Sequence, residues 1–380
     1  MREKDYFFMH EKTSASFNGY LDQKIRYIEQ IQLLRPELWK RFSGQFAQED
    51  ADFDNRWRGE YWGKMMRGAC LVYQYTKNPV LYALLEETVE DLLACQEESG
   101  RISCYHPSHE FQSWDLWERK YVLLGMEYFL EICRRKSLSE KVIASMRGQA
   151  DYLIERIGSR EEGKLPITET SAIWRGVNSS SILEPIARLY GLTGEERYRQ
   201  FAEEIIRCGG ARDGNLFQLA YADHIPPYQY PVTKAYETIS CFEGLLAFYR
   251  ATGVERYKTA AVQFGKQLLK TDFTVIGCCG TYHEQFDHST NRQANTNNVD
   301  VMQETCVTVT VMKFFYQLLL LTGDPTFADA FERSLYNAYL GSYNTEQKIG
   351  RIQAPASDRP FLPEPFPFDS YSPLTAGNRG

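Results

Sequence analysis

The stretch that decides the fold is residues 305–340, TCVTVTVMKFFYQLLLLTGDPTFADAFERSLYNAYL. Its first half, Thr305–Thr322, is apolar nearly all round, whereas its second half, Pro325–Leu340, has a single apolar face. A short polar turn, TGDP, separates them; its glycine can end one helix and its proline can start the next. The stretch therefore predicts a helical hairpin with a buried first helix and a half-exposed second helix.

The same kind of turn recurs along the chain. It occurs as YGLTGEERY at 190–198 and YRATGVERY at 249–257, and in weaker form as YTKNP at 75–79 and RRKSLSE at 134–140. The period is roughly 60 residues, which is one helical hairpin. We therefore predict an all-α fold in which hairpins form a ring of the (α/α)6-barrel type, and we find no convincing βαβ alternation.

Each hairpin contributes one inner and one outer helix. We expect inner helices at Arg58–Thr76, Trp114–Ile132, Ser181–Leu192, Tyr236–Ala251 and Thr305–Thr322. We expect outer helices at Asn18–Leu34, Pro79–Ala94, Glu140–Ile157, Glu195–Cys208, Glu255–Lys270 and Pro325–Leu340. Asn18 and Ser139 are the expected N-caps of two of them, and Pro36 is expected to end or kink the first outer helix.

A six-hairpin ring needs one more inner helix after Leu340. Residues 341–380 are rich in proline and predict loop and short extended segments instead. The expected domains are therefore a barrel over residues 1–340 that lacks its last inner helix, and a loop or extended segment over 341–380. Such a gap would expose an apolar seam between Arg58–Thr76 and Thr305–Thr322, which predicts self-association.

Charge and cysteine content limit the classes of partner and the location. The formal charge of −7 argues against a nucleic-acid partner, which requires a basic face. The start of the sequence has no signal-peptide pattern, and no stretch reaches the length of a membrane span. Most of the nine cysteines lie in helical patterns, as expected of reduced core thiols. We therefore predict a cytoplasmic protein without a membrane or nucleic-acid partner.

The loops that lead into inner helices carry the candidate functional side chains. In a hairpin ring these loops gather at one mouth, which predicts a cleft there. The side chains we predict for substrate binding are Trp114, Asp115, Trp117, His224 and His283. Aromatic residues make up 14% of the chain and suit sugar stacking, although packing between helices is the more common explanation of such a content.

Glu284 is the candidate general acid. It lies between His283 and Phe286, and a carboxyl beside aromatic rings has a raised pKa, so that it can donate a proton near neutrality. Sugar hydrolysis needs such an acid. An ordinary loop glutamate is the alternative.

Glu304 and Cys306 form a possible half of a zinc site. They lie two residues apart where a helix begins, and the positive N-terminal end of a helix favours carboxylate and thiolate ligands. Zinc usually has four protein ligands. Cys278 and Cys279 could supply two more, or could be semi-buried thiols in a loop.

Several runs resemble glycoside hydrolase family 127, whose members include retaining β-L-arabinofuranosidases. The runs are WRGEYWGK (57–64), DLWERKYVLLG (115–125), HEQF (283–286), NNVDVMQETCVT (297–308), LLTGDPTFADAFERSLYNAYL (320–340) and FDSYSPLTAGNRG (368–380). The resemblance extends from about residue 50 to the end of the chain and is most specific around Glu304-Thr305-Cys306 and in the last helix.

The resemblance implies an (α/α)6 barrel, an acid/base at Glu284 and a zinc site built from one glutamate and three cysteines. Glu304 and Cys306 match two of those ligands. The family's other two ligands, one of them its proposed nucleophile, are a cysteine pair downstream of the DSYSP segment, and this sequence ends before that position. Cys278 and Cys279 lie upstream and do not match the pair. The family's Gly-His pair before Tyr236–Ala251 is also missing here, and His224 is the nearest imidazole.

We therefore expect a β-L-arabinofuranosidase-type glycosidase that acts on plant-type glycans with zinc as cofactor. One alternative is a glycan hydrolase or epimerase of the same barrel type that works without metal. The other is an inactive, truncated chain that binds sugar or nothing.

Overall fold

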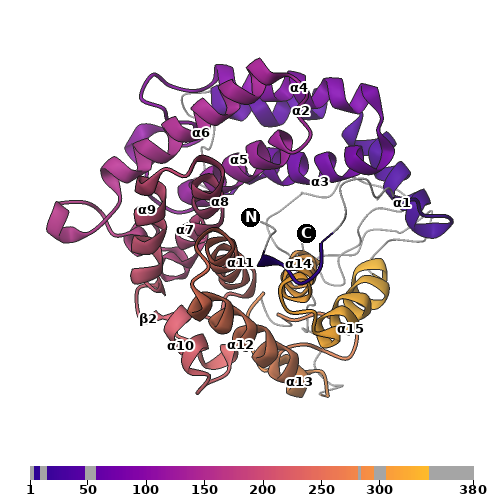
Figure 1. The fold of residues 1–380 in the computed structure, drawn as a ribbon, viewed down its shortest axis with the longest axis vertical. Helices are drawn as coiled ribbons and strands as arrows, with labels where there is room; N and C mark the ends of the chain where they lie inside the picture. Colours follow the sequence, from indigo (N-terminus) through magenta and orange to yellow (C-terminus); the bar gives the residue numbers. More distant parts are fainter. Residues whose placement is uncertain (1–3, 9–14, 48–56, 281–283, 295–304, 342–380) are drawn as a thin grey trace, which may run out of the picture. The chain divides into compact units, whose positions relative to one another are not determined.

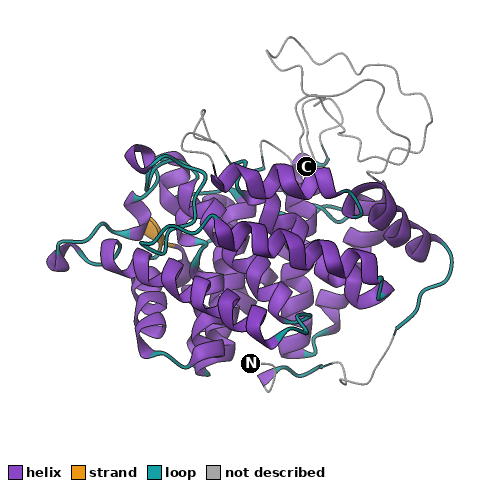
Figure 2. Ribbon diagram, turned by 90° about the horizontal axis from the view of Figure 1, so that it is seen from above, coloured by secondary structure: helices purple, strands orange, loops and turns teal. Residues whose placement is uncertain are grey.

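The computed structural model describes residues 4–8, 15–47, 57–280, 284–294 and 305–341. Most of these residues are helical, and loops make up nearly all of the rest, as Figure 2 shows. The strands of the described part are β1 (Gly210–Ala211) and β2 (Gly214–Asn215), each two residues long. The predicted all-α class is confirmed.

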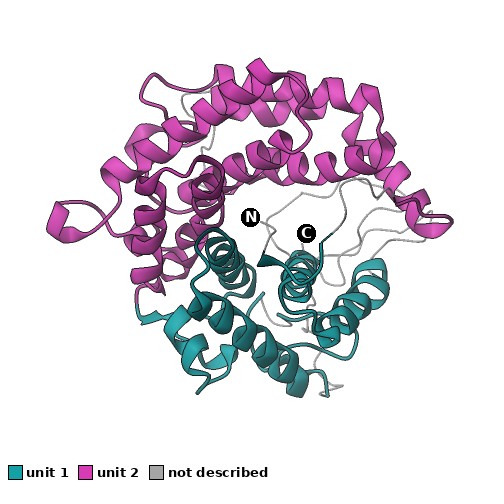
Figure 3. Cartoon of the chain, viewed as in Figure 1, with its two compact units in different colours: residues 1–8, 213–380 teal, residues 9–212 magenta. Residues whose placement is uncertain are grey.

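The chain divides into two compact units, coloured separately in Figure 3. The N-terminal unit comprises residues 9–212, and the C-terminal unit comprises residues 1–8 and 213–380. The predicted boundary after residue 340 and the missing inner helix concern residues 342–380, which lie outside the described residues. Both stay predictions.

The N-terminal unit is built from hairpins whose first helices pack side by side (Figure 1). Its α-helices are α1 (Tyr20–Ile28), α2 (Pro36–Ser43), α3 (Glu60–Thr76), α4 (Pro79–Ala94), α5 (Asp115–Leu130), α6 (Lys136–Arg156), α7 (Val177–Ser180), α8 (Leu183–Thr193) and α9 (Glu196–Arg207). Helix α5 packs against both α3 and α8, while α4, α6 and α9 pack against the first helices of their own hairpins. Because α5 is enclosed by neighbours, it is buried along almost its entire length.

The C-terminal unit repeats this arrangement. Its α-helices are α10 (Leu216–Ala222), α11 (Ala235–Thr252), α12 (Glu255–Thr271), α13 (Ser289–Arg292), α14 (Thr305–Thr322) and α15 (Pro325–Arg333). Helix α11 packs against α14, and α12 and α15 cover them. Helix α14 is apolar and long enough to cross a membrane by length and composition alone, but the same apolar residues pack against these neighbours, so they indicate nothing about location.

Short 3-10 and π turns complete the structure. The 3-10 turns are Gly44–Ala47, Pro107–His109, Arg160–Glu162, Ile167–Glu169, Ile173–Gly176 and Pro227–Gln229. The π turns are Glu29–Leu33, which follows α1, and Ser334–Tyr339, which follows α15. The two π turns explain why single helices were predicted at Asn18–Leu34 and Pro325–Leu340, since the coiled backbone continues through them.

The recurring Thr-Gly turn has the same geometry in three hairpins. Gly194, Gly253 and Gly323 each adopt a left-handed backbone, with φ of 68°, 78° and 69°, and end α8, α11 and α14. The preceding threonine hydroxyl donates to the carbonyl four residues earlier and accepts the N–H of the residue after the glycine. The repeat seen in the sequence is therefore a repeated helix cap.

The close approach of α3 and α5 depends on glycines that face one another. A Cβ placed on Gly125 would lie 3.0 Å from the Cα of Gly63 and 2.8 Å from the Trp62 ring. Larger side chains at these positions would push the two helices apart.

Two local predictions are wrong. The residue that caps α1 is Gly19, not Asn18, and it makes no side-chain cap. Helix α6 begins at Lys136, so Ser139 lies inside it and does not cap it. The prediction for Pro36 is confirmed, because the first helical run ends at Leu33 and Pro36 starts α2, where its missing N–H is not needed. Helix α10 was not predicted, because seven residues carry too weak a periodic pattern.

Candidate functional site

Loops that lead into first helices meet within each unit, as the sequence predicted. In the N-terminal unit, the Ser171 hydroxyl and the Asn178 amide both donate to the carbonyl of Ser113 at 2.7 Å, which joins the loop before α7 to the loop before α5. In the C-terminal unit, Phe286 N–H donates to the Thr233 carbonyl at 2.7 Å, which joins the loop before α14 to the loop before α11.

Backbone strain concentrates in these loops. Among the described residues, eight that are not glycine have positive φ. Two of them, Lys77 and Asp223, are ordinary helix C-caps. The other six lie in the loops that lead into first helices: Phe111, Ser113, Trp174, Arg175, Glu284 and His288. Strained residues persist where the surroundings hold them, and they are common at functional sites, which makes these loops of each unit candidates for function.

Glu284 is held against the start of α11. Its backbone is left-handed, with φ of 60°, and its carbonyl accepts the N–H of Ala235 at 2.8 Å. Its carboxylate Oε2 forms an ion pair with the ammonium of Lys234. Oε1 has no protein partner in the described part of the chain, and the side chain is 31% exposed. Glu284 therefore presents one carboxylate oxygen to the surroundings while the other is anchored.

The partner, Lys234, was missed by the sequence analysis. It precedes α11 directly, and the residue as a whole is 7% exposed. A lysine at the start of a buried helix is expected to be buried as well, and a lysine is rarely buried unless it is paired. This position in the sequence was therefore a signal that Lys234 has a charged partner.

Asp272 anchors the loop that carries Glu284, and the sequence analysis did not identify it either. This buried carboxylate follows α12, and its Oδ1 accepts the N–H groups of Asp287 and His288 at 2.9 Å and of Ser289 at 3.3 Å. Burial raises its pKa. Because it accepts hydrogen bonds from these three N–H groups, Asp272 holds the segment just after Glu284 in place.

The same segment packs on the loop that contains His224. The ring of His288 stacks on that of Tyr228, with centroids 4.4 Å apart and planes 3° from parallel. His224 itself is exposed. It shares a loop with Tyr228, and its predicted role in substrate binding stays a prediction.

Cys278 and Cys279 are core thiols. Both are 0% exposed. Cys278 Sγ lies 3.1 Å from the Thr274 hydroxyl, and burial raises the pKa of its thiol to about 12. Burial raises the pKa of Cys279 well above its ordinary value. Nucleophiles and metal ligands are thiolates, so this environment favours the packing role for the pair.

The predicted metal ligands are described only in part. Cys306 is half-buried in the first turn of α14, whereas Glu304 and also His283 lie outside the described residues. In the described part of the chain, no three His, Cys, Asp or Glu side chains come together in a way that could hold a metal ion. The described residues by themselves do not fit a zinc site, so no chemical step is derived through zinc.

Aromatic rings form a cluster in the N-terminal unit. The ring of Trp114 lies 6.2 Å from that of Trp57 and 5.7 Å from that of Trp117, and Trp117 lies 5.2 Å from Tyr121. Trp117 is 2% exposed, and its indole N–H donates to Glu60. Trp57 and Trp114 are half-buried, so these two rings are the accessible end of the cluster.

Asp115 holds the loop before α5 in place. It is 0% exposed. Its Oδ1 accepts from Arg119 Nε at 2.9 Å and from Ser103 Oγ at 2.7 Å, and its Oδ2 accepts from Phe111 N–H at 2.9 Å. Both oxygens are thus already hydrogen-bonded to the protein, which gives Asp115 a structural role.

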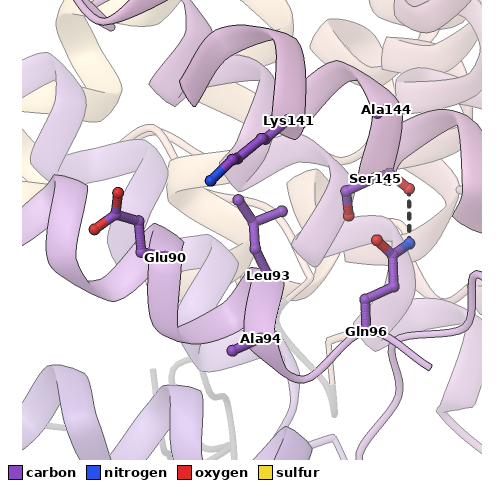
Figure 4. Close-up of a pocket in the computed structure, with 7 residues that line it drawn as sticks. All are labelled: Glu90, Leu93, Ala94, Gln96, Lys141, Ala144 and Ser145. Carbon is purple, nitrogen blue, oxygen red and sulfur yellow. Dashed lines mark hydrogen bonds between the residues drawn. The ribbon is translucent and has the colours of Figure 1, made fainter. Parts of the chain in front are cut away.

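A separate cleft of about 560 Å³ lies between α4 and α6 (Figure 4). Leu93 from α4 and Lys141 and Ser145 from α6 line it, and Gln96 Nε2 donates to the Ser145 carbonyl at 3.0 Å. None of its lining side chains belongs to the loops described above, so we do not assign the site to this cleft.

The fold defines the class of protein. It is shared with a sugar epimerase from a ruminal bacterium, which is 10% identical, with a TM-score of 0.56 over 87% of this chain and 88% of the epimerase. It is also shared with a GH127 β-L-arabinofuranosidase from Geobacillus stearothermophilus T6, which is 16% identical, with a TM-score of 0.66 over 87% of this chain and 57% of that one. The molecule thus shares the all-α helical-hairpin fold of these two proteins.

The chain belongs to the β-L-arabinofuranosidase GH127 catalytic domain family, whose sequence model matches residues 18–360. The match spans both units. A non-reducing end β-L-arabinofuranosidase of Bifidobacterium longum subsp. longum is 21% identical over 363 residues, which cover 87% of this chain and 52% of that protein. This chain therefore spans about half the length of that relative.

Proposed function

We propose that this chain is the helical part of a glycoside hydrolase that removes terminal β-L-arabinofuranosyl units from plant-type glycans with retention of configuration. Membership of the GH127 family supports the reaction class. The observation that carries the proposal is the geometry of Glu284, in which Oε2 is anchored on Lys234 and Oε1 has no partner among the described residues, in a side chain that is 31% exposed.

In this reaction Glu284 exchanges a proton with substrate oxygens. As a carboxylic acid it donates its proton to the departing glycosidic oxygen while the bond from that oxygen to the anomeric carbon breaks. As a carboxylate it then accepts a proton from the water that attacks the anomeric carbon. Both transfers need a carboxyl oxygen that can reach substrate, which Oε1 provides. We assign no described residue as the nucleophile.

Trp114 and Trp57 would bind the sugar. A flat indole face covers the apolar C–H face of a sugar ring, and these two rings are the accessible members of the aromatic cluster. Trp117 and Asp115 would support that surface from below, since both are buried and hydrogen-bonded within the unit. His224 and His283 remain candidates for contacts to sugar hydroxyls.

The test measures hydrolysis of an aryl β-L-arabinofuranoside and of a β-L-arabinofuranosyl disaccharide, and identifies the anomer released first by proton NMR. We expect β-arabinofuranose as the first product. Glu284→Gln should lower turnover of the disaccharide by roughly 100-fold or more, the usual scale of acid–base catalysis. Inversion, or an isomerised disaccharide without cleavage, would contradict the proposal.

A further inference from the structure

Lys234 and Glu284 are brought together by backbone pairing on both sides of their side-chain contact. Lys234 and Gln285 form an antiparallel bridge. On one side Ala235 N–H donates to the Glu284 carbonyl at 2.8 Å, and on the other Phe286 N–H donates to the Thr233 carbonyl at 2.7 Å. The register of the two segments is therefore fixed, and the lysine and the glutamate face each other as a consequence.

The burial of the two side chains is unequal. The side chain of Lys234 is 9% exposed and that of Glu284 is 31% exposed. An ammonium that has lost this much hydration needs a charged partner close by, and Glu284 Oε2 is that partner. A charge-assisted hydrogen bond of this kind is directional and strong, so it selects one rotamer of the carboxylate.

A fixed rotamer matters because the two carboxylate oxygens of Glu284 are otherwise equivalent. With Oε2 held by Lys234, only Oε1 remains to meet a glycosidic oxygen. A side chain that is one-third exposed and unanchored would sample several rotamers, most of which would direct neither oxygen at the substrate.

We infer that Lys234 is the positioning residue of Glu284, which fixes Oε1 as the atom that exchanges a proton with the glycosidic oxygen. This inference rests on the proposed function of Glu284. Lys234 itself touches neither the scissile bond nor the sugar; it acts through the carboxylate.

The experiment compares Lys234→Met, Lys234→Arg, Glu284→Gln and the double variant Lys234→Met/Glu284→Gln. Methionine keeps the length and apolar stem of lysine and removes its charge. For the disaccharide we expect Lys234→Met to lower kcat by roughly tenfold or more and to change KM by less than about threefold, because proton transfer is affected and binding is not. An aryl substrate with a good leaving group should lose less, since it needs little protonation. Lys234→Arg should restore part of the loss.

The double variant separates positioning from an independent role. With no carboxylate left to position, removing Lys234 should cost nothing further, so the double variant should match Glu284→Gln alone. If the loss of kcat in the double variant equals the product of the two single losses, the inference is overturned. A Lys234→Met variant with a raised KM and an unchanged kcat would also overturn it. Lys313→Met is the matched control, because it removes the lysine of another ion pair in the same unit, with Glu243 at 3.0 Å, and should leave the contrast between the two substrates unchanged.

Urea denaturation of the same four proteins gives a readout that does not depend on activity. We expect the unfolding equilibrium constants to be coupled by about fivefold or more, as for contacting groups. If the coupling factor between the two substitutions is less than about twofold, the side chains do not stabilise one another. The inference is then overturned even if the glycosidase is active. Coupling together with a wild-type chain that cleaves neither substrate would instead contradict the proposed function. If Lys234→Met does not fold, Lys234→Gln takes its place in the cycle.

Discussion

The buried carboxyl of Glu118 is expected to hold its proton well above the pH at which a glutamate ordinarily ionises. The hydroxyl of Ser103 lies 2.7 Å from both Asp115 Oδ1 and Glu118 Oε1. A hydroxyl has one proton and can donate to only one of them, so the second short contact requires a proton on a carboxyl. Asp115 is paired with Arg119, which stabilises its negative charge. The protonated group is therefore Glu118. Burial, and after it the charge of Asp115, raises the pKa of Glu118 to about 7.

The magnitude and the sign follow from the pKa values. The ordinary pKa of a glutamate is 4.5, and the folded protein raises that of Glu118 to about 7. Because the folded state binds this proton more tightly, the stabilising contribution is fully present below pH 4.5 and is lost as the pH rises through 7. At about 1.4 kcal/mol for a tenfold change in proton affinity, the difference between 4.5 and about 7 corresponds to a total loss of about 3.5 kcal/mol, of which about 3 kcal/mol falls between pH 4.5 and 8.

The assay is urea denaturation at pH values from 4.5 to 8, for the wild type and for Glu118→Gln. The amide cannot ionise, so the wild type should lose about 3 kcal/mol of unfolding free energy relative to the variant across this range. Buried acids that lie away from Glu118 titrate equally in both proteins and cancel in the difference. Glu87→Gln is the control, because this surface carboxylate pairs only with exposed Lys40 at 3.4 Å. If the unfolding free energies of the wild type and Glu118→Gln differ by the same amount at every pH between 4.5 and 7, Glu118 is ionised throughout. The assignment of a proton to Glu118 would then be wrong.

The remaining predictions concern the loop, the aromatic cluster and the metal. Asp272→Ala should destabilise the protein by about 3 kcal/mol, because three N–H groups lose a buried acceptor, and should lower kcat; unchanged unfolding in urea would refute the anchoring role. Trp114→Ala should raise KM by roughly tenfold with little change in kcat, and an unchanged KM would remove Trp114 from the sugar site. If Glu304 and Cys306 bind zinc, Glu304→Gln and Cys306→Ser should each lower the zinc content of purified protein by elemental analysis, and equal zinc in all three proteins would exclude these ligands.

Part of the candidate site could be predicted from the sequence. Glu284 was identified because its segment carries acid and imidazole groups, and because it resembles a known family. Lys234 and Asp272 were not identified, although they hold Glu284 and its loop in place. A lysine before a helix and an aspartate after one are common, and their importance arises from partners that are 50 and 15 residues away in the chain.

Helix ends also include some that the sequence predicts and some that it does not. The Thr-Gly turns were recognised because a left-handed cap requires glycine and because the threonine makes only local hydrogen bonds, so the information is contained in a few adjacent residues. Ser139 was misassigned as a cap because helix α6 starts a turn earlier, at Lys136, and its first turn already buries Leu138. Such burial overrides local preference.

The sequence by itself determined the all-α hairpin class, the positions of most helices and the family. Periodic apolar faces and repeated caps are local properties, and these are sufficient to specify hairpins. Only the tertiary structure decided which polar side chains are buried and which stay exposed. It placed Asp115, Trp117, Cys278 and Cys279 in the interior and left Trp114 and Glu284 partly exposed. The physical reason is that burial and charge pairing depend on neighbours brought together by folding, and no local pattern records them.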